Sequence, residues 1–85
     1  MSNMMNQLII EGTVKEIISN NNDERTVKIE NTYNENINIF TVCILTKLLK
    51  NNAIDIGNTL RIVGHLLLNA NNIVICAEHI EYKAK

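Results

Sequence analysis

One run of the sequence, residues 55–66, restricts most strongly what this chain can fold into. It reads Asp-Ile-Gly-Asn-Thr-Leu-Arg-Ile-Val-Gly-His-Leu, a turn followed by an apolar, β-branched strand. Gly57 lies where the backbone turns sharply, a conformation that glycine adopts without strain. Gly64 lies inside the strand, where a glycine typically marks a bulge, a barrel corner or a close backbone approach. The run therefore predicts one strand of a small, closed and curved sheet.

Four more strands are predicted. Side chains alternate between two faces in residues 7–18, 26–32 and 37–45, and residues 73–82 begin with a continuous apolar run. In the first of them Gly12 falls at mid-strand, which indicates a second bend or bulge. In the third, Phe40 shares one face with Val42, while Ile39 belongs to the opposite face. The five predicted strands are residues 7–18, 26–32, 37–45, 60–68 and 73–82, separated by turns rich in asparagine.

A short helix is predicted over residues 47–54, between the third and fourth strands. Thr46 precedes it and is predicted to cap it, with the hydroxyl accepting a backbone N–H. Leu45, Leu49 and Ala53 recur at the spacing of one helix face.

The order of three strands, a helix and two strands is that of an OB fold, a small Greek-key barrel. We therefore predict an all-β protein, a five-stranded OB-fold Greek-key barrel with one short helix between strands 3 and 4. The barrel is expected over residues 7–82, after a disordered lead of residues 1–6 and before a short basic tail of residues 83–85.

Several strands are apolar on both faces, notably at residues 8–10, 66–68 and 73–77. A chain of 85 residues supports one domain with one modest core. The second apolar face therefore needs another cover, and the most economical one is a second copy of the chain. A homo-oligomer, dimer or tetramer, is predicted; the alternative is an unusually hydrophobic strand without a partner.

Cys43 and Cys76 lie far apart in the sequence, each inside an apolar run. We interpret them as small buried apolar residues in a reducing compartment, in preference to a disulfide or a metal site. No Cys-x-x-Cys pattern and no histidine cluster occurs, so neither metal nor cofactor is predicted. No secretory signal and no apolar run of about 18 residues is present, which favours a cytoplasmic protein without a membrane span.

The sequence does not favour an enzyme. It contains no nucleophile elbow and no glycine-rich phosphate loop. Glu78, His79 and Glu81 form the densest titratable cluster, but neighbours on a strand are expected to point to opposite faces. His65 is interpreted as a surface or satisfied strand residue in preference to a catalytic base.

A binding module is the class that remains. OB barrels commonly bind single-stranded nucleic acid, with cations along the phosphates and flat side chains against the bases. The net charge of -1 is a weak electrostatic footprint for such a protein. Lys15, Lys28 and Arg61 are on predicted strands and are candidates to converge on one barrel face; the alternative is ordinary surface charge.

Four segments together carry a family resemblance. Residues 5–12 read Met-Asn-Gln-Leu-Ile-Ile-Glu-Gly, and residues 40–48 read Phe-Thr-Val-Cys-Ile-Leu-Thr-Lys-Leu. Residues 56–66 read Ile-Gly-Asn-Thr-Leu-Arg-Ile-Val-Gly-His-Leu, and residues 77–82 read Ala-Glu-His-Ile-Glu-Tyr. In this order they resemble the bacterial single-stranded DNA-binding protein family, over nearly the whole chain. The last two segments are the more specific ones.

The resemblance implies an OB fold, oligomers built from barrels, and binding of single-stranded DNA with little sequence preference. It also implies work in DNA replication, recombination or repair, with replication proteins as further partners. Primosomal replication protein N, a dimer, is a close cousin in the same superfamily. The residues expected at the DNA are the cations Lys15, Lys28, Lys47 and Arg61 on phosphates, and Tyr33, Ile39 and Leu45 on bases.

The chain also departs from the family pattern. The two base-stacking aromatic positions of the third strand fall at Ile39 and Leu45, and Phe40 is offset by one residue onto the opposite face. The loss of each stacking aromatic side chain lowers the binding free energy by roughly 1–3 kcal/mol per base. The loop between the fourth and fifth strands is short, and the family's acidic C-terminal tip is missing from this sequence, so recruitment of partners through such a tip is not expected.

Two alternatives follow from these departures. The first is a protein-interaction or primosome-type adaptor module on an OB scaffold, with weak or no DNA binding. The second is a small subunit of a helicase or nuclease complex.

Overall fold

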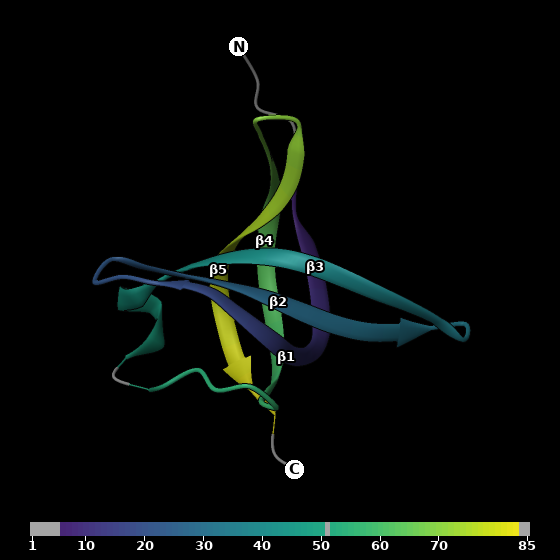
Figure 1. Ribbon diagram of the computed structural model, residues 1–85, viewed down its shortest axis with the longest axis horizontal. Coiled ribbons are helices and arrows are strands. Elements are labelled where there is room, and N and C mark those ends of the chain that lie inside the picture. Colours follow the sequence, from purple (N-terminus) through teal and green to yellow (C-terminus); the bar gives the residue numbers. More distant parts are fainter. Residues whose placement is uncertain (1–5, 51, 84–85) are drawn as a thin grey trace.

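Five strands and one helical turn follow one another along the chain (Figure 1). The computed structural model describes residues 6–50 and 52–83. The elements are β1 (Leu8–Asn20), β2 (Glu24–Tyr33), β3 (Asn36–Leu45), the 3-10 turn η1 (Thr46–Leu49), β4 (Thr59–Asn69) and β5 (Asn72–Tyr82). All five predicted strands are confirmed. The predicted disordered lead falls mostly outside the described residues, as does most of the basic tail.

The strands close into a barrel in the order β1-β2-β3-β5-β4. The pairs are antiparallel except for β3 and β5, which run parallel. β1 takes part twice, because its first half pairs with β4 and its second half pairs with β2. This order, with one short helical element between β3 and β4, is that of an OB fold, so the predicted fold class is confirmed.

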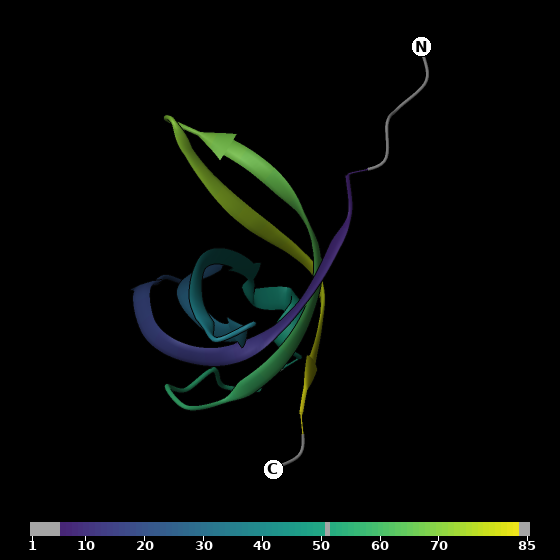
Figure 2. The ribbon, with the colours of Figure 1, turned by 90° about the vertical axis from the view of Figure 1, so that its right-hand side faces the viewer.

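Gly12 lies at the bend where β1 passes from β4 to β2. A Cβ atom at this position would lie 2.6 Å from the carbonyl oxygen of Glu30 on β2. Only a residue without a side chain therefore lets the two backbones approach this closely. Figure 2 shows β1 curving around the barrel, and the bend predicted from the mid-strand glycine is confirmed.

Gly64 marks a second close approach, between β4 and β5. The β4–β5 register shifts here, because Val63 pairs with His79 and Gly64 pairs with Ala77. Glu78 is therefore an extra residue on β5, which defines a β-bulge. A Cβ at Gly64 would collide with the carbonyl oxygen of Cys76. The interruption predicted at this glycine is confirmed.

The bulge overturns one expectation about β5. Glu78 and His79 do not point to opposite faces; both are exposed on the outside of the barrel, while Ala77 before them is buried. The extra residue breaks the strict alternation of side chains along the strand. The bulge thereby gathers titratable side chains on the outer surface.

The predicted helix over residues 47–54 is wrong in length and type. η1 is a single 3-10 turn, and Lys50 follows it with φ 49, a left-handed conformation that ends helices. Thr46 does not cap the turn, because Leu45 occupies the N-cap position and no side chain bonds there. Leu49, the last residue of η1, is buried. Ile54 is also buried, so the irregular segment after η1 contributes a side chain to the core.

Aliphatic side chains fill the barrel. The largest fully buried ones are Val14, Val27, Ile29, Val42, Ile44, Leu60 and Ile62. Phe40 packs against this core, whereas its neighbour Ile39 faces outward with 58% of its surface exposed. The predicted assignment of the two faces of β3 is therefore confirmed.

Further apolar side chains are exposed outside the core, on both faces of the β4–β5 hairpin, as the strands that are apolar on both faces predicted. Ile9 on β1 and Leu67, Leu68 and Ile73 on β4 and β5 are exposed large aliphatic residues. The β4–β5 hairpin projects from the barrel at the top of Figure 1, while the β2–β3 hairpin projects to the right. The two hairpins thus present separate surfaces.

Candidate nucleic-acid interface

The outward-facing residues of β2 and β3 form one continuous surface, which we call the β2–β3 face. Because the two strands pair without a register shift, their outward residues form regular cross-strand rows. From the barrel end to the hairpin tip the rows are Glu24–Leu45, Thr26–Cys43, Lys28–Thr41, Glu30–Ile39 and Thr32–Ile37.

Three of the predicted contact residues lie on this face. Lys28 occupies its middle row, between the rows that carry Ile39 and Leu45. Both aliphatic side chains are exposed, Ile39 by 58% and Leu45 by 43%. Among the described residues Lys28 forms none of the ion pairs present in the structure. The ammonium group of Lys28, which takes part in none of these ion pairs, therefore lies between the exposed apolar side chains of Ile39 and Leu45.

Three further predicted residues flank the β2–β3 face. Lys15, at a register shift of β1, places its Nζ 3.8 Å from Oε1 of Glu30. Tyr33 lies at the hairpin tip and is 71% exposed, and its pairing with Asn36 puts it on the side of the hairpin opposite to Ile39. Lys47, in η1, lines a shallow groove of about 360 Å³ beside Leu45. The cations and the exposed apolar side chains thus form a strip that runs from η1 to the hairpin tip.

Arg61 lies apart from this strip, on β4, which pairs with β1 and β5 but not with β2 or β3. Its guanidinium is 3.3 Å from a carboxylate oxygen of Glu11 and 3.3 Å from one of Glu81. Lys83 Nζ also lies 3.3 Å from Glu11. The structure therefore brings together the predicted contact residues Lys15, Lys28, Ile39, Leu45 and Lys47. Tyr33 lies on the other side of the hairpin tip, and Arg61 lies on β4, where two carboxylates balance its charge.

The Glu11 cluster makes stability depend on pH. The hydrogen bond and charge of Lys83, and then the charge of Arg61, lower the pKa of Glu11 below its ordinary value of 4.5. A lowered carboxylate pKa stabilises the fold above the unfolded-state pKa, and this stabilisation is lost as the pH falls through the folded-state pKa. The cluster is exposed, so its contribution is modest.

Glu11→Gln is accordingly expected to lower the thermal midpoint slightly at pH 7. The difference from the wild type should shrink at an acidic pH below the folded-state pKa of Glu11, where Glu11 is protonated in the folded protein as well. Thermal unfolding followed by circular dichroism at the two pH values measures this. Glu35→Gln, in the exposed turn of the β2–β3 hairpin, is the control and should change neither midpoint. A deficit of Glu11→Gln that stays unchanged down to the lowest pH at which the protein is still folded would contradict the assignment.

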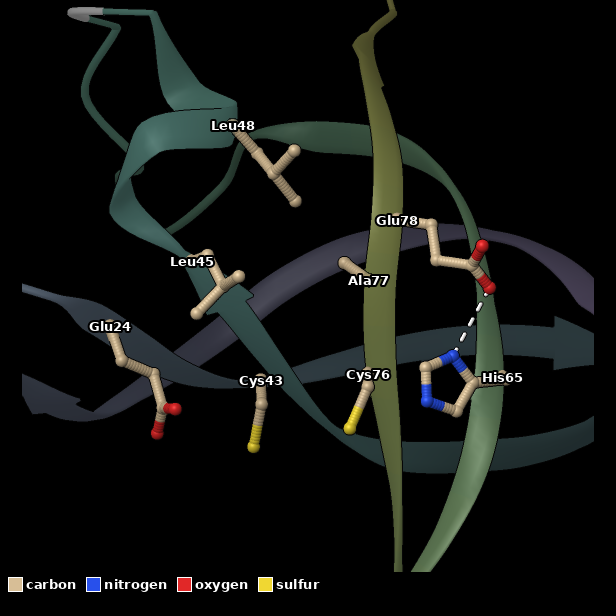
Figure 3. A pocket seen from close by; sticks show the side chains of 8 residues that line it. All are labelled: Glu24, Cys43, Leu45, Leu48, His65, Cys76, Ala77 and Glu78. Atoms are coloured by element: carbon tan, nitrogen blue, oxygen red, sulfur yellow. Dashed lines mark hydrogen bonds and ion pairs between the residues drawn. The ribbon is translucent and has the colours of Figure 1, made fainter.

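A second surface feature lies where β3 and β5 run parallel, and we call it the seam groove (Figure 3). It encloses about 380 Å³. Its lining residues come from four strands and η1 and are Glu24, Cys43, Leu45, Leu48, His65, Cys76, Ala77 and Glu78. Sequence reasoning missed this groove, because the parallel pairing joins residues that no local pattern connects.

His65 and Glu78 form a pair at the edge of the seam groove. His65 Nδ1 lies 3.1 Å from Glu78 Oε1 (Figure 3). The interpretation of His65 as a surface or satisfied strand residue is confirmed. Glu78 follows the buried Ala77 and therefore points to the same outer side as Cys76, the register partner of His65. The residue that the bulge turns outward against simple alternation is His79.

The two cysteines differ from their predicted environment. Cys43 and Cys76 are not buried; both are free, partly exposed and on the outside of the barrel. Within residues 6–50 and 52–83, no three His, Cys, Asp or Glu side chains are grouped as a metal ion requires. No helix in the same residues is long and apolar enough to cross a bilayer.

Comparison with known proteins identifies the fold but no sequence family. Neither a protein-family model nor a curated protein sequence matches the chain. Solved structures do match. The dimeric N-terminal domain of PriB from Thermoanaerobacter tencongensis superposes with a TM-score of 0.82 at 16% identity, covering 94% of this chain and 98% of that one.

The fold is that of single-stranded DNA-binding proteins and PriB. A small single-stranded DNA-binding protein from Mycoplasma pneumoniae matches with a TM-score of 0.67 at 16% identity, covering 92% of this chain and 93% of that one. A chain of a replication protein A heterotrimer bound to single-stranded DNA matches with a TM-score of 0.73 at 20% identity, covering 95% of this chain and 60% of that one. The fold implied by the sequence resemblance, to this family and to its primosomal cousin, is therefore confirmed.

Proposed function

We propose that this protein binds single-stranded DNA with little sequence preference, through the β2–β3 face. The observation that carries the proposal is the strip of cations and exposed apolar side chains along the β2–β3 face, with Lys15 of β1 and Lys47 of η1 beside it. The structural neighbours that are single-stranded DNA-binding proteins support the class of ligand. Phosphates attract cations and every base has an apolar face, so such a strip fits a single strand of any sequence.

Each residue of the strip has a proposed role. Lys15, Lys28 and Lys47 contact phosphates, and Tyr33 at the exposed hairpin tip stacks on a base. Ile39 and Leu45 give apolar contact to bases in the rows on either side of Lys28. Arg61 is a fourth proposed phosphate contact, but a phosphate that reaches it must displace Glu11 or Glu81.

The charge of the face sets the expected strength of binding. Glu24 and Glu30 belong to the same rows as Leu45 and Ile39, so carboxylates lie close to the proposed strand path. Aliphatic side chains also give less stacking energy than aromatic ones. Binding should therefore be weaker than on a basic, aromatic surface and should depend strongly on salt.

Titration of fluorescently labelled oligo-dT with the protein tests the function. Three or four phosphate contacts to a single strand predict a slope of about −2 to −3 in a plot of log K against log salt concentration. A duplex of the same length is the control and should bind more weakly. Absence of binding to oligo-dT at low salt would end the proposal.

Lys28→Ala and Arg61→Ala form a matched pair of cation substitutions. Lys28→Ala should weaken oligo-dT binding several-fold and reduce the salt slope by about 0.7, since one free phosphate contact is lost. Arg61→Ala should have a smaller effect, because two carboxylates already balance that charge. Equal losses for the two variants would extend the interface over β4, contrary to the placement on the β2–β3 face.

Self-association is proposed for the other apolar surface. The exposed aliphatic residues Ile9, Leu67, Leu68 and Ile73 lie on β1, β4 and β5, away from the β2–β3 face. A second copy of the chain would cover them and leave the DNA surface free. The PriB domain with this fold is dimeric. Light scattering at the titration concentrations distinguishes a dimer or tetramer from a monomer.

A second candidate function follows from the same apolar residues. In a protein-interaction or primosome-type adaptor, they would bind another protein and DNA binding would be weak or absent. The proposed process in both cases is DNA replication, recombination or repair, with replication proteins as partners. A stable protein partner that co-purifies with the chain after nuclease treatment, together with no oligo-dT binding, would favour the adaptor.

A further inference from the structure

Cys43 and Cys76 lie directly opposite each other where β3 meets β5. These strands pair in parallel, and within the described residues the register partners are only Val42 with Ile75 and Cys43 with Cys76. Every other strand pair in the barrel has a longer ladder. The parallel seam is therefore the shortest ladder of the closed barrel, and one of its two rows consists of two thiols.

The two side chains share one environment. Both line the seam groove, and in Figure 3 the two sulfur atoms project to the same side of the sheet. Neighbouring strands are about 4.7–4.9 Å apart, inside the range of about 4.4–6.8 Å between Cα atoms that a disulfide spans. Both cysteines are free and partly exposed, so a small oxidant can reach them from the groove.

We propose that Cys43 and Cys76 are a modification site, at which a peroxide forms an intrachain disulfide that closes the β3–β5 seam covalently. One thiolate attacks the peroxide oxygen and becomes a sulfenic acid, while the other peroxide oxygen leaves and is protonated to water or an alcohol. The second thiolate then attacks the sulfenic sulfur, and hydroxide leaves as water. Two thiols and one peroxide thus give one disulfide, with two electrons passing from sulfur to oxygen.

The local charges set the rate of this reaction. Burial raises the pKa of the Cys76 thiol, and the neighbouring Cys43 and Glu24 raise it further. His65 on β4 faces the same groove but is paired with Glu78 on β5. Since the thiolate is the reactive form, oxidation should be slow at neutral pH and should accelerate as the pH rises toward the thiol pKa. The two thiols are therefore expected to form the disulfide only under prolonged exposure to peroxide.

Formation of the disulfide should raise the thermal stability of the barrel. A disulfide here joins strands that are far apart in the sequence, which restricts the unfolded chain strongly. It also adds a covalent link to the β3–β5 ladder, which has two register pairs among the described residues. The oxidised protein should therefore unfold at a higher temperature than the reduced one, by roughly 10 °C.

The test treats the full chain with hydrogen peroxide at pH 8 and then alkylates it under denaturing conditions. The expected product is a monomer on a non-reducing gel that takes up no alkyl group at either cysteine and regains both thiols after reduction. Its two cysteine-containing peptides should be linked and together lighter by about 2 Da. Its thermal midpoint should rise on oxidation and return on reduction. Each of these readouts is independent of DNA binding.

Cys43→Ser and Cys76→Ser are the matched controls. Peroxide should leave the thermal midpoint of either variant unchanged, since one thiol cannot form the intrachain bridge. Three results would overturn the proposal for the wild type: two thiols that stay alkylatable after long treatment, a disulfide-linked dimer, or a gain of about 32 Da per thiol from sulfinic acids. If the disulfide forms but the thermal midpoint does not rise, the expected stabilisation of the β3–β5 seam is wrong.

Discussion

Gly64→Ala is expected to lower the free energy of unfolding by about 3 kcal/mol, the upper end of what overpacking usually costs. The added Cβ would collide with the carbonyl oxygen of Cys76 and lie 3.2 Å from Cα of Ala77. These are backbone atoms of β5, so no side-chain rotation relieves the contact. A domain of this size is stable by about 4–13 kcal/mol, so the loss is a large share. Urea denaturation followed by circular dichroism measures it.

Gly57→Ala is the control for this prediction, because it separates steric collision from backbone strain. Gly57 has φ +96, yet a Cβ there would meet nothing within 4 Å. Alanine at this position should cost only about 1–2 kcal/mol, for adopting a left-handed conformation. A Gly64→Ala protein as stable as the wild type would show that β4 and β5 separate easily at the bulge, contrary to the packing described.

Ile39→Trp is expected to tighten binding of oligo-dT by roughly tenfold or more. Ile39 is 58% exposed on the β2–β3 face, in the row next to that of Lys28. An indole at this place can stack on a base, and one such contact contributes about 1–3 kcal/mol, where 1.4 kcal/mol is tenfold in affinity. Fluorescence anisotropy with labelled oligo-dT at fixed salt concentration measures the change.

Ile56→Trp is the matched control. Ile56 is exposed to a similar extent, 66%, but lies in the connection between η1 and β4. An indole there should leave affinity unchanged. Leu45→Trp is a second test at the other end of the strip, and its smaller exposure of 43% predicts a smaller gain. If neither Ile39→Trp nor Leu45→Trp tightens binding, the strand does not run along this face.

The part of the fold that sequence could predict rests on local patterns. Alternation and apolar, β-branched runs placed the five strands, and alternation assigned Ile39 and Phe40 to opposite faces, because successive side chains of a strand point to opposite sides. Gly12 and Gly64 predicted a bend and a bulge, since a missing Cβ is useful only where backbones approach closely. Each of these features depends on residues that are close together in the sequence, so a local pattern predicts it.

The features that sequence could not predict depend on register and three-dimensional pairing. The extra residue Glu78 breaks the alternation of β5, and only the partner strand reveals it. Arg61 meets Glu11 and Glu81 because β4 lies between β1 and β5. Of the candidate site, the placement of Lys28, Ile39 and Leu45 on one face follows from alternation along β2 and β3, whereas the separate position of Arg61 could not be predicted.

The double pairing of β1 has a consequence for cooperativity. One continuous strand serves as the edge partner of β4 with its first half and of β2 with its second. If β1 detaches, both neighbours expose unpaired backbone groups at once, and the buried Val14 leaves the core. The barrel therefore has no half that is complete without β1, so unfolding should occur as a single all-or-none transition.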